Sequence, residues 1–256
     1  FQPDSNLEDV VTRYYFDKEL RLILFDAIET IEITLRTQMI YHLSQSYGGL
    51  WYCDPELFAA AAFHARNLKE LMDESLRSNE IFEKDNKRKH YITNTDGERI
   101  LDEYPDAWII FEVATFGTLS KIYKNLNHQL PEISAIANDM GLNLHNELSG
   151  WLEAISYMRN IIAHHSRVWS RKMVKLPCEI LNPRMAWLSR PLTEVQQKKP
   201  YYVITAMLYL CNAIDEGDTF KEKLLALFKE YADVPIYKIG FFNRWEEEPI
   251  WKKMSE

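Results

Sequence analysis

The chain has 256 residues, enough to bury a sizeable core, and its 46% hydrophobic and 27% charged residues exclude an intrinsically disordered protein. Its three cysteines are odd in number and far apart, which argues against a disulfide framework and favours a reducing, cytoplasmic location. The net charge of −8 argues against a general nucleic-acid binder. The longest strongly apolar stretch, residues 201–214, is shorter than the roughly 20 residues of a membrane span, so no membrane partner is expected.

The beginning of the chain is predicted to be helical. Apolar residues recur every three or four positions over residues 16–47, which indicates a long amphipathic helix that Gly48 ends. Asp54 followed by Pro55 then predicts the cap and the first residue of a second helix, which runs to about Arg77.

The middle of the chain is more varied. Residues 78–104 are polar and aperiodic, and we expect a loop excursion there. Pro105 precedes a predicted helix over residues 108–125. Gly117 lies inside that helix and indicates a kink or a close helix crossing.

The rest of the chain continues the helical pattern. We expect, in order, a short helix over 131–140 that Gly141 ends, a long helix over 144–172, an irregular basic segment over 176–200, helices over 201–214 and 219–231, and an aromatic tail over 234–256 that packs across the body. No window alternates at a period of two residues. The sequence therefore predicts an all-α fold in a single domain, residues 1–256, with long central helices and an irregular C-terminal tail.

Positive charge is concentrated in one part of the chain. Residues 154–200 contain nine basic and two acidic residues and carry +7, whereas the remainder carries −15. A basic patch on an acidic body is typical of a site for one anionic substrate. The alternative is a solvated surface segment whose neighbours in space supply the missing acids.

The densest group of reactive side chains lies in the predicted helix over 144–172. On a wheel of about 100° per residue, six residues fall within an arc of about 140°: Ser156, Arg159, Asn160, Ala163, His164 and Arg167. This face would present two guanidinium groups, an amide and an imidazole. His165 falls on the opposite, apolar side and is expected to be a core or hinge residue.

These groups suit the cleavage of RNA by its own 2′-hydroxyl, which needs a base, an acid and cations around the phosphorus. Histidine can act as base or acid near neutral pH, and arginine can hold two phosphate oxygens at once. No metal or other cofactor is required, and no carboxylate cluster on that face would hold a metal. Because one chain offers one such histidine, a homodimer with a composite site is the natural arrangement. The alternative is an ordinary solvated helix face with a structural histidine.

Five stretches of the chain together resemble the Abi-like (abortive infection) family of the AbiD and AbiF type, within the HEPN superfamily of RNases. They are Tyr15-Phe16-Asp17-(x)2-Leu20-Arg21, Ile28-Glu29-(x)2-Glu32-Ile33-(x)-Leu35-Arg36, Trp108-(x)3-Glu112-(x)3-Phe116-Gly117-Thr118-Leu119-Ser120, Arg159-Asn160-(x)3-His164-His165-(x)-Arg167-(x)-Trp169, and Gly240-Phe241-(x)3-Trp245. The fourth stretch contains the R-x4-H signature of such RNases. The signature alone is weak, but five matches in the right order are specific.

The resemblance implies a HEPN-like helical bundle, a homodimer, and metal-independent RNA cleavage by a toxin of phage defence or of a toxin–antitoxin system. Three alternatives stay open for the antitoxin, which would be an RNA, a protein or absent. It gives catalytic roles to Arg159, Asn160 and His164. His165 and Arg167 match the extended motif, and we expect them to bind the RNA substrate together with the neighbouring Arg171 and Lys172. The family usually has further helical sequence before the position of Phe1, so a preceding segment is expected.

Glu112 lies in a predicted apolar helix, where a buried acid would need a cation. We expect it to orient Arg159 from behind, and the alternative is a salt bridge elsewhere in the core, with Arg36 as another possible partner. Two other functions stay open for the chain. One is a non-catalytic HEPN module that binds RNA or protein, and the other is a structural helical dimer whose basic segment contacts an acidic partner.

Overall fold

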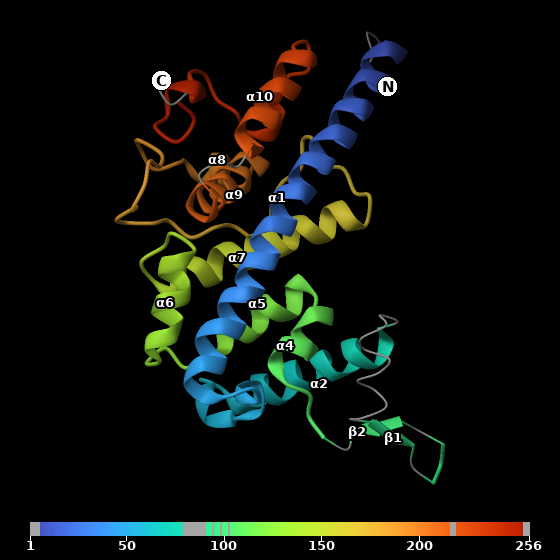
Figure 1. Ribbon diagram of the computed structural model, residues 1–256. Coiled ribbons are helices and arrows are strands. Elements are labelled where there is room, and N and C mark those ends of the chain that lie inside the picture. Colours follow the sequence, from blue (N-terminus) through green and yellow to red (C-terminus); the bar gives the residue numbers. More distant parts are fainter. Residues whose placement is uncertain are drawn as a thin grey trace. The chain divides into compact units, whose positions relative to one another are not determined.

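A computed structural model of the chain (Figure 1) describes residues 6–78, 91–93, 95–97, 99–101, 103–215 and 219–252. The chain divides into two compact units, Phe1–Ile33 with Asp139–Glu256, and Thr34–Asn138. The all-α prediction is confirmed, because helices dominate the described residues of both units. The single domain over 1–256 and the HEPN-like bundle stay predictions.

The first unit consists of helices and one irregular segment. Its elements are the first part of α1 (Leu7–Tyr47), then α7 (His145–Ala163), α8 (Glu194–Gln197), α9 (Pro200–Ile214), α10 (Phe220–Glu230) and the 3-10 helices η4 (Ile236–Ile239) and η5 (Trp245–Glu247). The second unit holds the end of α1, then η1 (Trp51–Cys53), η2 (Pro55–Leu57), α2 (Ala61–Arg77), β1 (Tyr91–Thr93), β2 (Arg99–Leu101), α4 (Ala107–Ile110), η3 (Phe111–Val113), α5 (Phe116–Asn125) and α6 (Pro131–Asp139).

The long helix α1 begins earlier than predicted and ends where the sequence places its end, with Gly48 at a φ of 79°. Its buried side chains recur every three or four residues, which confirms the predicted stripe: Phe16, Leu20, Leu24, Ala27, Ile28, Ile31, Leu35, Met39 and Leu43. Within the first unit, α10 packs against this stripe. The rings of Phe16 and Tyr231 lie 5.8 Å apart, and the Tyr231 hydroxyl donates to Glu19 over 2.7 Å.

Helix α9 is buried along nearly its whole length, as predicted, and organises the core of the first unit. Tyr209 of α9 meets Trp151 of α7 edge to face at 5.4 Å. The aromatic tail packs on the other end of α9, where Phe241 lies 4.9 Å from Tyr201 and 5.4 Å from Trp251. The predicted packing of the tail is therefore confirmed for its described residues, 234–252.

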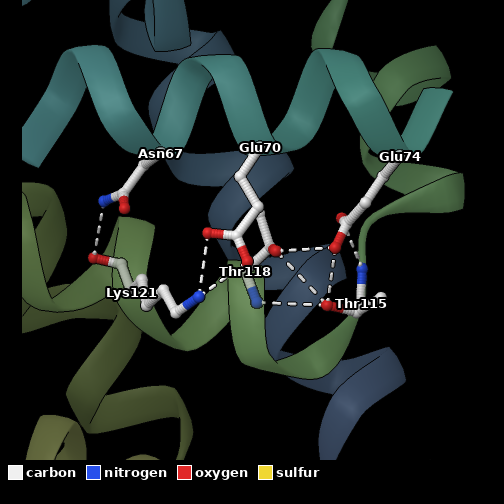
Figure 2. A network of polar contacts seen from close by, with 6 residues as sticks. All are labelled: Asn67, Glu70, Glu74, Thr115, Thr118 and Lys121. Carbon is white, nitrogen blue, oxygen red and sulfur yellow. Dashed lines mark hydrogen bonds and ion pairs between the residues drawn. The ribbon is translucent and has the colours of Figure 1, made fainter. Parts of the chain in front are cut away.

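In the second unit, a polar network joins α2 to α5 (Figure 2). The carboxylate of Glu74 accepts hydrogen bonds from the Thr115 N–H at 3.0 Å and from the hydroxyl groups of Thr115 and Thr118, each at 2.9 Å. Along the same pair of helices, Lys121 donates to both oxygens of Glu70 at 2.6 and 2.8 Å. Thr115 also caps α5 by accepting from the Thr118 N–H, which fixes the start of that helix.

Two predicted helices of this unit need correction. Asp54 does cap a helix, but that helix is the short η2, and α2 begins later at Ala61. The helix predicted over 108–125 is interrupted at Ala114 and Thr115, so α4 and η3 are separate from α5. Gly117 lies in the first turn of α5, and the interruption precedes it because Thr115 caps a new helix there.

The loop predicted over 78–104 contains a hairpin that the sequence analysis missed. Strands β1 and β2 pair antiparallel, with Ile92 opposite Ile100. Gly97 has a φ of 81° and follows Asp96, and an Asp-Gly pair between short apolar runs is a turn signal for hairpins. Residues 79–90, 94, 98 and 102 of this segment lie outside the described residues.

Candidate functional site at the end of α7

The helix that carries the R-x4-H signature ends sooner than predicted. Helix α7 stops at Ala163, not near Lys172, and His164 is its C-cap. The His165 N–H donates to the Ile162 carbonyl and the Ser166 N–H to the Ile161 carbonyl, both at 2.9 Å. This pair of bonds is a Schellman motif, whose residue after the cap takes a left-handed conformation.

His165 occupies that left-handed position with a φ of 52°. Glycine is the usual residue there, although histidine enters this region more readily than most side chains. Because the sequence has no glycine here, the helix end was not predicted. The wheel positions assigned to His165 and Arg167 are therefore wrong, and His165 is exposed instead of lying in a core.

The structure keeps the catalytic candidates together on the last turn of α7. Arg159 is half-buried, Asn160 and His164 are exposed, and the His164 N–H donates to the Asn160 carbonyl at 3.1 Å. Neither the Arg159 guanidinium nor the His164 imidazole has a hydrogen-bond or ion-pair partner among the described residues. Both groups are thus available to a ligand at the end of this helix.

A buried carboxylate holds the chain that follows α7. Asp17 of α1 is 6% exposed, and its Oδ1 accepts the N–H groups of Val168 and Trp169 at 2.9 and 2.6 Å. Its Oδ2 accepts from Arg21 Nε at 3.1 Å, and the Arg21 side chain is only 14% exposed. Asp17 therefore fixes the backbone just beyond the signature and is itself held by a neighbouring cation.

The indole of Trp169 contacts two arginines from different elements. The Arg13 Cζ of α1 lies 5.6 Å from the Trp169 ring centroid, and the Arg167 Cζ lies 5.9 Å from it. These distances are within the range of cation–π contacts. Arg171 folds back on the same segment, because its Nε donates to the Arg167 carbonyl at 2.6 Å.

For the basic residues of the stretch 154–200, each of the two interpretations that the sequence left open holds in part. Lys175 pairs with Glu153 and Lys198 with Glu194, so neighbouring acids do balance part of the charge. Arg159, Arg167 and Arg171 make no ion pair with any described residue, and Lys172 is exposed. Four of the basic residues without an ion pair to a described residue therefore lie at and just after the end of α7.

Sequence reasoning was also wrong about the environment of Glu112, and it missed two residues. Glu112 is exposed in η3, so the premise that it is a buried acid is wrong, and its orientation of Arg159 stays a prediction. Asp17 and Arg13 were not recognised as part of this region. Asp17 does belong to the first of the five stretches, which was the available signal. Its contact with Val168 could not be inferred from a spacing of 151 positions.

Two features are absent from the described residues. No group of three or more histidine, cysteine, aspartate and glutamate side chains is arranged there to hold a metal ion. None of the helices in the described part of the chain combines the length and apolarity that a membrane crossing requires.

Comparison with known proteins identifies the family. The family model described as Abi-like protein matches residues 1–170, which include α1, α7 and the loop held by Asp17. No curated protein and no solved structure matches the chain. Because the match covers well over half of the sequence, the chain belongs to the Abi-like protein family, and this membership supports a function in abortive infection.

Proposed function

We propose that this member of the Abi-like protein family is a metal-independent endoribonuclease toxin of a phage-defence or toxin–antitoxin system. The observation that carries the proposal is the last turn of α7, where Arg159, Asn160 and His164 lie together and neither the guanidinium nor the imidazole has a partner among the described residues. Unpaired cationic and imidazole groups at one helix end favour an anionic ligand and proton transfer.

The proposed reaction is a transesterification. His164 takes the proton of the RNA 2′-hydroxyl, the 2′-oxygen attacks the adjacent phosphorus, and the bond from phosphorus to the 5′-oxygen breaks. A second imidazolium protonates the departing 5′-oxygen, which leaves a 2′,3′-cyclic phosphate and a 5′-hydroxyl. Arg159 stabilises the negative charge that grows on the phosphoryl oxygens, and Asn160 hydrogen-bonds to the same group. His165, Arg167, Arg171 and Lys172 bind the flanking RNA.

The need for two proton-transferring groups favours a homodimer, in which two copies of His164 share one composite site. Sedimentation of the purified protein tests the dimer. Mixing His164→Ala with wild type tests the composite site. If both copies of His164 act in one site, a mixed dimer is inactive, and an equimolar mixture that exchanges subunits should keep only about a quarter of the wild-type activity. About half of the activity in a mixture that forms mixed dimers would contradict the composite site.

The decisive experiment is the cleavage of a labelled, structured RNA in the presence of EDTA. Wild type, His164→Ala and the control His128→Ala, a surface histidine of the second unit, are compared at equal concentration. General acid–base catalysis contributes about 10²- to 10⁴-fold, so His164→Ala should lose at least about 100-fold in rate while His128→Ala keeps the wild-type rate. The products of wild type should end in a 2′,3′-cyclic phosphate.

Other results would contradict the proposal in different ways. Equal rates for wild type and His164→Ala would remove His164 from the mechanism. RNA that is bound but left whole by every variant would replace the nuclease with a non-catalytic RNA-binding module.

A further inference from the structure

The indole of Trp169 and the two guanidinium groups beside it form a cluster of which the proposed function uses only Arg167. We propose that Arg13 and Arg167, held against Trp169, form an RNA phosphate-binding subsite next to the end of α7, with Asp17 as its positioning residue. This inference rests on the proposed function, and it adds α1 to the substrate-binding surface.

The first argument is the charge of the cluster. Two guanidinium groups lie within 5.6 and 5.9 Å of one ring, although like charges repel. Arg13 has an exposed partner, Asp9, at 4.0 Å, and Arg167 has no ion pair with a described residue. A cation–π contact orients a guanidinium through its face and leaves the N–H donors at its edge free to bind an anion.

The second argument is preorganisation. The two N–H bonds to the buried Asp17 fix the backbone of Val168 and of Trp169, which carries the indole, and Arg21 holds the carboxylate in turn. A binding surface that is ordered before the ligand arrives loses less conformational entropy when it binds. The Trp169 Nε1–H is also buried with no acceptor among the described residues, so the cluster already contains an unused donor.

The third argument is location along the chain. Arg167 follows His164 by three residues, so their Cα atoms are separated by no more than about 11 Å. A phosphodiester bound by Arg167 and Arg13 would therefore belong to the same RNA strand that reaches His164. Guanidinium groups bind phosphate through paired hydrogen bonds, and contacts to phosphate carry no base specificity, so this subsite would bind the RNA backbone whatever its sequence.

The test measures RNA binding in a background that does not cleave. In His164→Ala protein, Arg13→Ala, Arg167→Ala and the double variant are titrated with a labelled single-stranded RNA over a range of salt concentrations. Arg66→Ala is the matched control, because Arg66 is also an exposed arginine that lies over an aromatic ring, 5.3 Å from the centroid of Phe63, but belongs to the second unit. Thermal melting of each variant shows that it is folded.

We expect each of the two substitutions to weaken binding by about tenfold at low salt. Each lost phosphate contact should also lower the slope of log K against log salt by about 0.7. A merely structural effect would weaken binding without changing that slope. The Arg13→Lys variant keeps the charge but loses the planar fork, so it should retain the salt slope and recover only part of the affinity. Arg66→Ala should match the background protein in both quantities.

An unchanged dissociation constant and salt slope for Arg13→Ala would overturn the subsite, even if wild type cleaves RNA as proposed. A larger dissociation constant with an unchanged salt slope would also overturn the subsite, because it would indicate an indirect effect. Absence of both RNA binding and cleavage by wild type would instead overturn the proposed function, and this inference with it.

Discussion

Removal of the Asp17 carboxylate should be one of the most destabilising single changes near the end of α7. Asp17→Ala deletes the acceptor of two backbone N–H groups, at 2.9 and 2.6 Å, and of Arg21 Nε at 3.1 Å. The alanine leaves these donors without a partner in a place where the original side chain was 8% exposed. It also leaves Arg21, whose side chain is 14% exposed, without its counterion.

The magnitude follows from the loss of these contacts. A hydrogen bond to a charged group contributes about 1.5–3 kcal/mol, and the three bonds are not additive because they share one carboxylate. Breaking a buried ion pair by removing one partner costs about 3–5 kcal/mol. We therefore expect Asp17→Ala to lower the free energy of unfolding by about 3–5 kcal/mol. Asp17→Asn keeps one acceptor oxygen for the backbone but loses the charge, so it should lose about half as much.

Urea denaturation measures the free energy, and hydrogen exchange of a peptide that spans Val168 and Trp169 measures the local effect. Asp26→Asn is the control on the same helix, because Asp26 forms an exposed pair with Lys223 that should contribute less than about 1 kcal/mol. A loss below about 1 kcal/mol for Asp17→Ala, or unchanged exchange of the peptide, would refute the inference that Asp17 holds the backbone of Val168 and Trp169 in place.

Three further predictions concern other parts of the chain. Gly141→Ala should lower the free energy of unfolding, measured by urea denaturation, by at least about 2 kcal/mol, because Gly141 has a φ of 82° and an added Cβ would lie 2.5 Å from the Cβ of Ala213. An unchanged free energy of unfolding would contradict the left-handed backbone and close packing at Gly141. Glu74→Gln should lower the free energy of unfolding by about 1–2 kcal/mol, because an amide has a single acceptor oxygen and cannot replace both carboxylate oxygens as acceptors for the Thr115 N–H and for the hydroxyl groups of Thr115 and Thr118. Burial raises the pKa of the Cys178 thiol to about 11, so its thiolate is scarce at lower pH. Alkylation of Cys178, followed by peptide mass spectrometry, should be slow at pH 8 and rise about tenfold per pH unit until that pKa; fast labelling at pH 8 would contradict the burial.

The parts of the fold that the sequence predicted well are those that depend on local periodicity. The stripe of α1 follows from apolar residues at helical spacing, and α9 follows from an almost unbroken apolar run. The break before α5 and the short η2 depend instead on the capping side chains of Thr115 and Asp54. The free-energy difference between such a cap and a continued helix is small, so a pattern of apolar residues does not reveal where a cap ends or begins a helix.

The candidate site was predicted in its residues but not in its geometry. Arg159, Asn160 and His164 are near neighbours in sequence, so any helix brings them together. The surroundings depend on a carboxylate 151 positions away from the backbone it binds, and no local pattern contains such a contact. The wheel also placed Arg167 on a helix face, whereas the structure places it beyond the helix end beside an indole.

The left-handed position of His165 offers a way to separate the stability of the helix end from its proposed binding of RNA. A non-glycine residue at a φ of 52° has a conformational cost of about 1–2 kcal/mol that glycine avoids, although glycine also gains entropy in the unfolded chain. His165→Gly should therefore raise the free energy of unfolding by up to about 1 kcal/mol. If the exposed imidazole binds RNA, the same variant should bind RNA more weakly, so the two measurements should move in opposite directions. His165→Asn is the control, because asparagine tolerates the left-handed region but lacks the imidazole. A less stable His165→Gly would show that the imidazole itself holds the helix end, and unchanged RNA affinity in both variants would restrict His165 to a structural role.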